Sequence, residues 1–206
     1  MTEALYSAEN YILEGYNMLL CFAGAMILHE PDEECIADFW KKGMLKGLPV
    51  SSSNPVFLKA SEQLKESCFC SSSNATAMRK DFQRLLADDN SLAPVYESSY
   101  LTNEMGIIDF YESYGWKPDL RSNMRDDHLS TELLFLSRLI EEYIGFDDEA
   151  CRREQRLEIK RLINNHLLSW IPQWHDKIQK NALTMCYKGV SSLVYACIQD
   201  IYSLLD

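Results

Sequence analysis

Apolar side chains recur at helical spacing along nearly the whole chain. They return every three to four positions from about Ala8 to Leu28, and a stronger stripe follows Asp126. We find no segment that alternates apolar and polar residues between hairpin turns. The pattern predicts an all-α bundle of roughly eight to ten helices, forming one domain over residues 1–206.

Helix boundaries are marked by capping residues, prolines and glycines. Asn54 followed by Pro55 is typical of a helix start, and the acidic pair Asp147-Asp148 predicts the start of a long helix that Pro172 ends. A short helix is expected through Phe39 and Trp40. The Ser-rich segment 71–74 is a candidate hinge between an N-terminal helical part and the rest of the chain.

The most apolar predicted helix begins near Asp126. One stripe combines five residues at helical spacing, and three more widen it: Leu129, Leu133, Leu136, Ile140 and Tyr143, then Leu134, Phe135 and Leu139. A helix that is apolar most of the way round usually lies at the centre of its bundle. We therefore expect this helix to be central.

Composition and charge narrow the partners. The chain has 206 residues, 47% of them apolar, which argues against disorder. Its net charge of −11 disfavours nucleic acid, because phosphate binding needs clustered Lys and Arg. A negative surface attracts a basic peptide, although acidity that serves solubility alone is an open alternative.

The number of cysteines and the N-terminal sequence indicate in which cellular compartment the protein is expected. The seven cysteines are an odd number, and the N-terminal sequence M-T-E-A-L-Y has no basic region typical of a signal peptide. The longest apolar run, Met18 to Leu28, has eleven residues and is too short to span a bilayer. These features predict a cytoplasmic protein with reduced thiols and no stable membrane insertion.

Asp127 and His128 stand where the apolar helix is expected to start. Asp127 suits the cap of that helix, and the pair also suits a polar contact with a partner. A hydrolytic dyad ranks below both, because neighbouring helical residues point in different directions and the sequence has no G-x-S-x-G elbow. We therefore predict no enzyme activity, no cofactor and no metal site.

A second cluster combines aromatic and acidic residues. Tyr96, Glu97 and Tyr100 follow a proline, so we expect some of them on an exposed turn, where rings and a carboxylate suit an arginine side chain. Packing of the tyrosines against the core is the alternative. Trp116 either anchors a loop or lines a groove.

Three other polar side chains lie on predicted apolar helices. His166 shares a face with apolar neighbours and is interpreted as a hydrogen-bonded core residue. Glu132 and Arg138 lie on the predicted central helix, as an internal ion pair or as a solvated edge.

Four short motifs follow one another along the chain: D-F-Q-R-L-L from Asp81, A-P-V-Y-E-S-S-Y-L from Ala93, D-D-H-L-S-T-E-L-L-F-L from Asp126 and N-H-L-L-S-W-I-P-Q-W from Asn165. Together and in this order they resemble motifs of the TorD/DmsD/NarJ family of cytoplasmic chaperones for molybdenum enzymes. The resemblance runs from about Phe82 to the C-terminus. Arg121 and Arg125 stand where the fuller family signature has a glutamate and a proline or tyrosine.

The resemblance implies a TorD-like fold and a chaperone role. Such proteins bind the twin-arginine signal peptide of a molybdopterin oxidoreductase precursor and hold the enzyme back from export until its cofactor is inserted. The implied site is an apolar groove with acidic rims. Its candidate residues are Tyr96, Glu97, Tyr100, Trp116, Asp127, His128 and Glu132.

The sequence is also compatible with two other functions. An all-α scaffold protein would bind a folded redox-enzyme subunit through an apolar patch, without recognising a leader. A metal-dependent hydrolase using Asp127 and His128 is the third reading. The oligomeric state is expected to be a monomer or a domain-swapped dimer with residues 71–74 as the hinge.

Overall fold

The computed structural model describes residues 8–32, 47–68, 75–101, 106–118 and 125–206. Within these ranges the chain is all-α, which confirms the predicted fold class. Helices α7 and α8 join through a π-helical turn, so the described ranges contain seven separate helical rods, slightly below the eight to ten predicted for the chain. The helices are α1 (Ala8–Leu28), α3 (Pro55–Ser67), α4 (Ala75–Leu85), α5 (Ile107–Ser113), α6 (Leu129–Gly145), α7 (Glu149–Leu162), α8 (Leu168–Asn181) and α9 (Met185–Leu204), with a 3₁₀ turn, η2, at Glu97–Ser99 and the π turn, η3, at Ile163–Leu167.

Two expectations fall outside the described residues. The short helix through Phe39 and Trp40 is one, and the hinge at residues 71–74 is the other. Both remain predictions.

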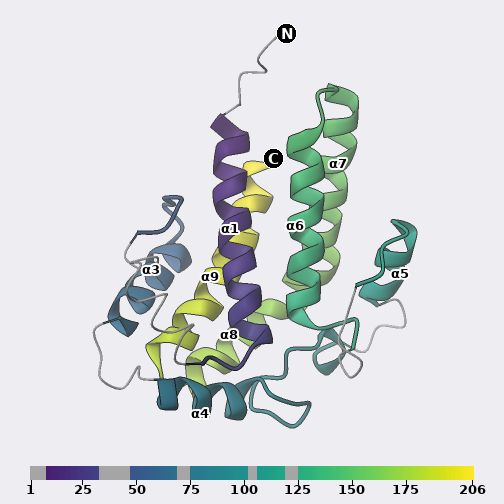
Figure 1. Ribbon diagram of the computed structural model, residues 1–206. Coiled ribbons are helices and arrows are strands. Elements are labelled where there is room, and N and C mark those ends of the chain that lie inside the picture. The colour runs from purple at the N-terminus through teal and green to yellow at the C-terminus, as the bar shows by residue number, and fades with distance from the viewer. Residues whose placement is uncertain (1–7, 33–46, 69–74, 102–105, 119–124) are drawn as a thin grey trace.

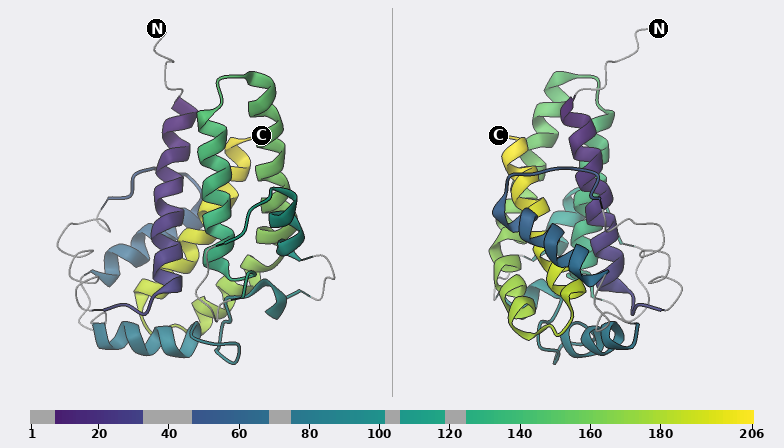
Figure 2. Two further views of the ribbon diagram at one scale, coloured as in Figure 1. Left: turned by 45° about the vertical axis from the view of Figure 1, so that its right-hand side comes forward. Right: turned by 90° about the vertical axis from the view of Figure 1, so that its left-hand side faces the viewer.

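Long helices run side by side through the molecule. Helix α1 packs against α6 and α9, and α6 packs against α7 (Figure 1). Helix α3 crosses α9, while α4 lies across one end of the bundle (Figure 2). The described part of the chain begins and ends near the opposite end of the bundle, so α4 and the start of α6 lie far from both (Figure 1).

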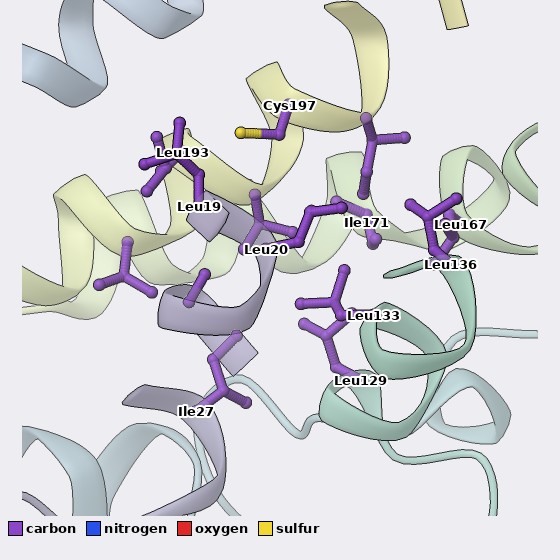
Figure 3. Packing of buried hydrophobic residues seen from close by; sticks show 14 of the residues in the cluster. Leu19, Leu20, Ile27, Leu129, Leu133, Leu136, Leu167, Ile171, Leu193 and Cys197 are labelled. Carbon is purple, nitrogen blue, oxygen red and sulfur yellow. The ribbon is translucent and has the colours of Figure 1, made fainter. Parts of the chain in front are cut away.

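The core forms where α1, α6, η3, α8 and α9 converge. Leu20 from α1 and Leu133 from α6 lie among side chains of α8 and α9 (Figure 3). All five residues of the predicted α6 stripe are buried, with exposed fractions of 1% or less. Helix α6 is therefore a core helix, as its sequence predicted. The expectation that Leu134 widens the stripe is wrong, because its side chain is 56% exposed.

Local capping signals agree with the structure at two helix starts. The Asn54 side chain accepts a hydrogen bond from the Val56 amide at 2.9 Å, with proline at the first position of α3. The Asp148 side chain accepts from the Cys151 amide at 2.9 Å and caps α7. These caps satisfy amides that have no partner inside the helix.

The prediction that Pro172 ends the long helix is wrong. Pro172 lies inside α8, and the helical path continues to Asn181. The π turn Ile163–Leu167 directly precedes α8. A proline inside a helix lacks one backbone N–H donor and crowds the carbonyl of the preceding turn. The π turn just before α8 changes the backbone hydrogen bonding next to that turn, and the helix continues past Pro172.

Among the described residues, α1 alone is long and apolar enough to cross a membrane by length and composition. Half of its most apolar stretch is buried inside the protein. Because α1 packs against both α6 and α9, its apolar composition also fits a helix that contributes side chains to the protein core.

Two glycines provide a test of the α3–α9 packing. A methyl group on Gly189 would lie 2.7 Å from the Leu64 side chain and 3.0 Å from its backbone nitrogen, whereas one on Gly24 would meet nothing within 4 Å. Gly189→Ala is expected to lower the free energy of unfolding by about 1–3 kcal/mol. Gly24→Ala should be neutral or raise it by up to about 1 kcal/mol through helix propensity. Urea unfolding of both variants measures the difference, and equal stabilities would contradict the close approach.

Candidate functional site

Two distant sequence segments meet at the start of α6. The Leu129 amide donates to the Val95 carbonyl at 2.7 Å, and the Glu97 amide donates to the Asp127 carbonyl at 3.0 Å. Tyr96 and His128 thereby form an isolated antiparallel bridge. The pairing joins the segment around Tyr96 to the Asp-His pair.

Asp127 does not cap α6, contrary to the capping alternative. The cap is His128, whose Nδ1 accepts from the Ser130 amide at 3.1 Å. The Asp127 carboxylate instead accepts from the Ser98 amide at 3.0 Å, from the Ser98 hydroxyl, and from Arg125 Nε at 3.2 Å. Each member of the pair therefore holds a different segment, and both are almost fully buried.

His128 lies beneath the ring of Tyr96. The two ring centroids are 5.3 Å apart at an interplanar angle of 81°, an edge-to-face contact. Burial lowers the pKa of His128 to about 4, and the opposing effect of the nearby Asp127 carboxylate is smaller. His128 is thus neutral at physiological pH, as its acceptor role at the cap requires.

The low pKa of His128 predicts acid sensitivity. In the folded protein the pKa of His128 is lowered from 6.5 to about 4. The neutral His128 side chain therefore contributes its full stabilisation above pH 6.5, and this stabilisation is lost as the pH falls toward 4. Asparagine also caps helices but does not titrate in this range. We expect wild type to lose about 2 kcal/mol more than His128→Asn between pH 7 and pH 5. Urea unfolding at both pH values measures the two free energies of unfolding. An equal loss of stability in wild type and in His128→Asn would contradict a buried neutral imidazole.

Glu97 is buried rather than exposed, which corrects the expectation of a surface carboxylate. Its Oε2 accepts from the Ile107 amide at 3.1 Å, the first amide of α5. Its Oε1 lies 2.9 Å from His166 Nδ1. The interpretation of His166 as a hydrogen-bonded core residue is confirmed. Glu97 fastens η2 to α5 and to the π turn.

Glu132 is fully buried and forms no ion pair with Arg138. Trp170 Nε1 donates to its Oε2 at 3.3 Å, while Arg138 bonds Glu142 at the surface at 2.9 Å. Burial, with the nearby Glu97 carboxylate second, raises the pKa of Glu132 well above its ordinary value. The predicted alternatives for this pair were both wrong for Glu132. At 3.6 residues per turn, positions 132 and 138 lie on different faces of α6, so Glu132 faces Trp170 in the core and Arg138 faces solvent.

Tyr100 packs on the core with its hydroxyl satisfied. Its ring stacks on Trp170 with centroids 5.2 Å apart, and its hydroxyl donates to the Pro94 carbonyl at 2.9 Å. The ammonium of Lys177 lies 4.3 Å from the ring centroid. Tyr100 therefore follows the packed alternative and links the η2 segment to α8.

Trp116 lies in the loop after α5, half-buried, and both alternatives for it apply. Its ring packs against Tyr111 and Phe135, with centroids 4.7 and 4.9 Å away. It also lines a pocket of about 260 Å³. Its wall is formed by Tyr111 and Trp116 with Ile108 and Pro118, and its charged lining residues are Glu112, Asp126 and Lys117.

The structure brings the predicted residues into one region. Tyr96, Glu97, Asp127 and His128 are joined by backbone pairing, and Tyr100 and Glu132 share Trp170 as a neighbour. Trp116 lies beside this group and packs against Tyr111 and Phe135. Only part of the set is near solvent: Tyr96, Tyr100 and Trp116 are half-buried, and the four polar members are buried.

Sequence reasoning missed three residues of this region. Arg125 contacts both Asp127 and Tyr96, Ser98 donates to Asp127, and Asp89 accepts from Arg125. Arg125 was noted only as a departure from a signature. Its contacts with Asp89 and Ser98 span 36 and 27 residues, so no local spacing marks them. Arg121, the other departure, lies outside the described residues.

Metal ligation was also considered for this region. In the described part of the chain, no group of three or more His, Cys, Asp and Glu side chains is placed to hold a metal ion.

Comparison with known proteins gives one family. The family model described as nitrate reductase delta subunit matches residues 56–176, more than half of the chain. The matched segment includes every candidate site residue and begins earlier than the resemblance seen from the motifs. A search among curated proteins found no significant match.

Proposed function

The chain belongs to the nitrate reductase delta subunit family, as the TorD/DmsD/NarJ resemblance predicted, and we propose that it binds the N-terminal leader of a molybdopterin oxidoreductase subunit. Members of this family are cytoplasmic chaperones for molybdoenzyme maturation. The family match over residues 56–176 is the observation that carries the proposal. In this role the protein assists folding and cofactor insertion and delays export.

The surface chemistry supports a basic client. A twin-arginine leader carries two guanidinium groups followed by an apolar helix-forming run. The net charge of −11 favours encounter with such a segment. The pocket beside Trp116 combines an aromatic wall with two carboxylates, of Glu112 and Asp126, against one ammonium, of Lys117. This excess of negative charge beside apolar surface suits a segment that is basic at one end and apolar at the other.

The candidate residues divide into contact and support roles in this proposal. The half-buried rings of Tyr96 and Trp116 and the edge of Asp127, whose side chain is 12% exposed, form the contact surface. Glu97 and His128 hold that surface from beneath through η2 and the α6 cap. Glu132 and Tyr100 brace it against Trp170 without touching the client.

Calorimetric titration tests the proposal. The ligands are N-terminal peptides of molybdopterin oxidoreductases from the same organism, each with its arginine pair intact and with both arginines changed to lysine. We expect micromolar affinity for one intact leader and marked weakening by lysine, which lacks the planar fork of guanidinium. Absence of binding to every leader would contradict leader recognition.

A second candidate function is assembly through a folded subunit, and one surface favours it. A pocket of about 630 Å³ between α1 and α6 is lined by Met18 and Ile144 with Glu14 and Glu141 at its edge. Met18 is 61% exposed, and Tyr11 on the same helix is 72% exposed. If this face binds a folded subunit, Met18→Asp abolishes co-purification with that subunit and leaves leader titration unchanged.

A further inference from the structure

Arg125 lies in a setting that is chemically suited to a bound arginine. Its guanidinium carbon lies 3.9 Å from the centroid of the Tyr96 ring. Its three nitrogens donate to three different side chains: Nε to Asp127 at 3.2 Å, Nη1 to Asp89 at 3.2 Å and Nη2 to Ser98 at 3.2 Å. Stacking on a ring combined with a fork of directed donors is how guanidinium is distinguished from ammonium.

The partners of Arg125 are held in place by other contacts. Asp127 accepts from the amide and the hydroxyl of Ser98, and Tyr96 is fixed by its backbone bridge to His128 and by the contact between their rings. The ring face and the carboxylate therefore stay in position when the Arg125 side chain swings away. A preformed site costs little to reorganise on binding.

The guanidinium of Arg125 lies at the surface. Its side chain is 45% exposed; one partner, Asp89, is 60% exposed, and the other, Asp127, is 12% exposed. A competing guanidinium regains the contact with Asp127, so the exposed pair with Asp89 is the one that displacement gives up. Ion pairs exposed to this extent contribute little to stability, because water screens them and two side chains must be ordered. The Arg125 side chain can therefore be displaced by a competing guanidinium at small cost.

We propose that Tyr96, Asp89, Ser98 and Asp127 form a guanidinium-binding site that Arg125 occupies in the free protein, and that an arginine side chain of a client peptide displaces it. The identity of the client rests on the proposed function. Occupation by Arg125 lowers the apparent affinity for an external arginine, because only the fraction of molecules with the site open can bind. The chain thus carries an internal competitor that keeps client binding weak and reversible.

Titration with a small probe tests the site apart from any client. The probe is N-acetyl-arginine methylamide, with N-acetyl-lysine methylamide as its counterpart, followed by NMR shifts of amides near Tyr96. Arg125→Ala should bind the arginine probe about threefold to fivefold more tightly than wild type. Arg125→Lys keeps the charge and loses the fork, and it should also bind more tightly. Tyr96→Leu added to Arg125→Ala should remove the binding.

Arg138→Ala is the matched control. Arg138 has the same side-chain exposure of 45% and also donates to a carboxylate, on Glu142, so the net charge changes equally. Arg138→Ala should bind like wild type. Equal affinity of Arg125→Ala, Arg125→Lys and Arg138→Ala, with all three folded by circular dichroism, would overturn the proposal.

The two proposals fail differently. If leaders do not bind but the arginine probe prefers Arg125→Ala, the guanidinium site stands and the client assignment falls. If leaders bind wild type and the Arg125 variants with equal affinity, leader recognition stands and the proposal that Arg125 competes for the site is wrong.

Discussion

Asp81→Ala is expected to lower the free energy of unfolding by about 3–5 kcal/mol, the largest effect of any single change considered. The Asp81 carboxylate has no exposed surface. It accepts from the amides of Leu183 and Thr184 at 2.9 and 2.7 Å and from the Thr184 hydroxyl at 2.8 Å. Arg84 pairs with it at 2.9 Å.

The size of this effect follows from the groups left behind. Thr184 precedes the first residue of α9, so Asp81 on α4 holds the start of α9 from another helix. Alanine would leave these donors without their acceptor, and each unsatisfied buried donor costs about 1–3 kcal/mol.

Urea unfolding measures the Asp81 effect. Asp81→Asn keeps one acceptor oxygen and should lose less stability than alanine. Asp147→Ala, at an exposed loop position, should stay within about 0.5 kcal/mol of wild type. If Asp81→Ala unfolds at the same urea concentration as wild type, the result would contradict the role assigned to this carboxylate.

Glu97→Ala is expected to lower the free energy of unfolding by about 3 kcal/mol and to abolish client binding. The variant removes the acceptor of the Ile107 amide and the partner of His166, both buried. Without it, η2 loses its tie to α5 and the π turn. Tyr96 and Ser98, which flank Glu97 in the chain, would then lose the position that the guanidinium site needs.

A double-mutant cycle with His166→Ala isolates the pair. The sum of the stability losses of the two single variants should exceed the loss of the double variant by a coupling of about 1–3 kcal/mol. Glu62→Ala, at an exposed position of α3, is the control and should bind clients like wild type. Strict additivity, or full client binding by Glu97→Ala, would contradict the support role.

Local signals predicted the scaffold well because they act over a few residues. The α1 boundaries, the Asn54 and Asp148 caps and the buried stripe of α6 all follow from spacing and cap chemistry within one or two turns. The central position of α6 follows from the same stripe, because a helix apolar on most sides needs neighbours on most sides.

The site was harder to predict because its contacts are distant in sequence. Asp127 was a reasonable cap by spacing, yet it binds Ser98, 29 residues away, and leaves the cap to His128. Glu97 was expected at the surface, yet it meets His166, 69 residues away. Tertiary partners decide which of two adjacent polar residues caps a helix and which carboxylate is buried, and single-sequence patterns do not contain that information.

The molybdenum content of the client enzyme tests the central claim most directly. The client is identified by the leader titration and is purified from cells with and without this protein. A maturation chaperone predicts that the enzyme from cells lacking the protein contains much less molybdenum cofactor and recovers it when the wild-type gene is restored. A fully loaded and active enzyme from cells lacking the protein would contradict the account.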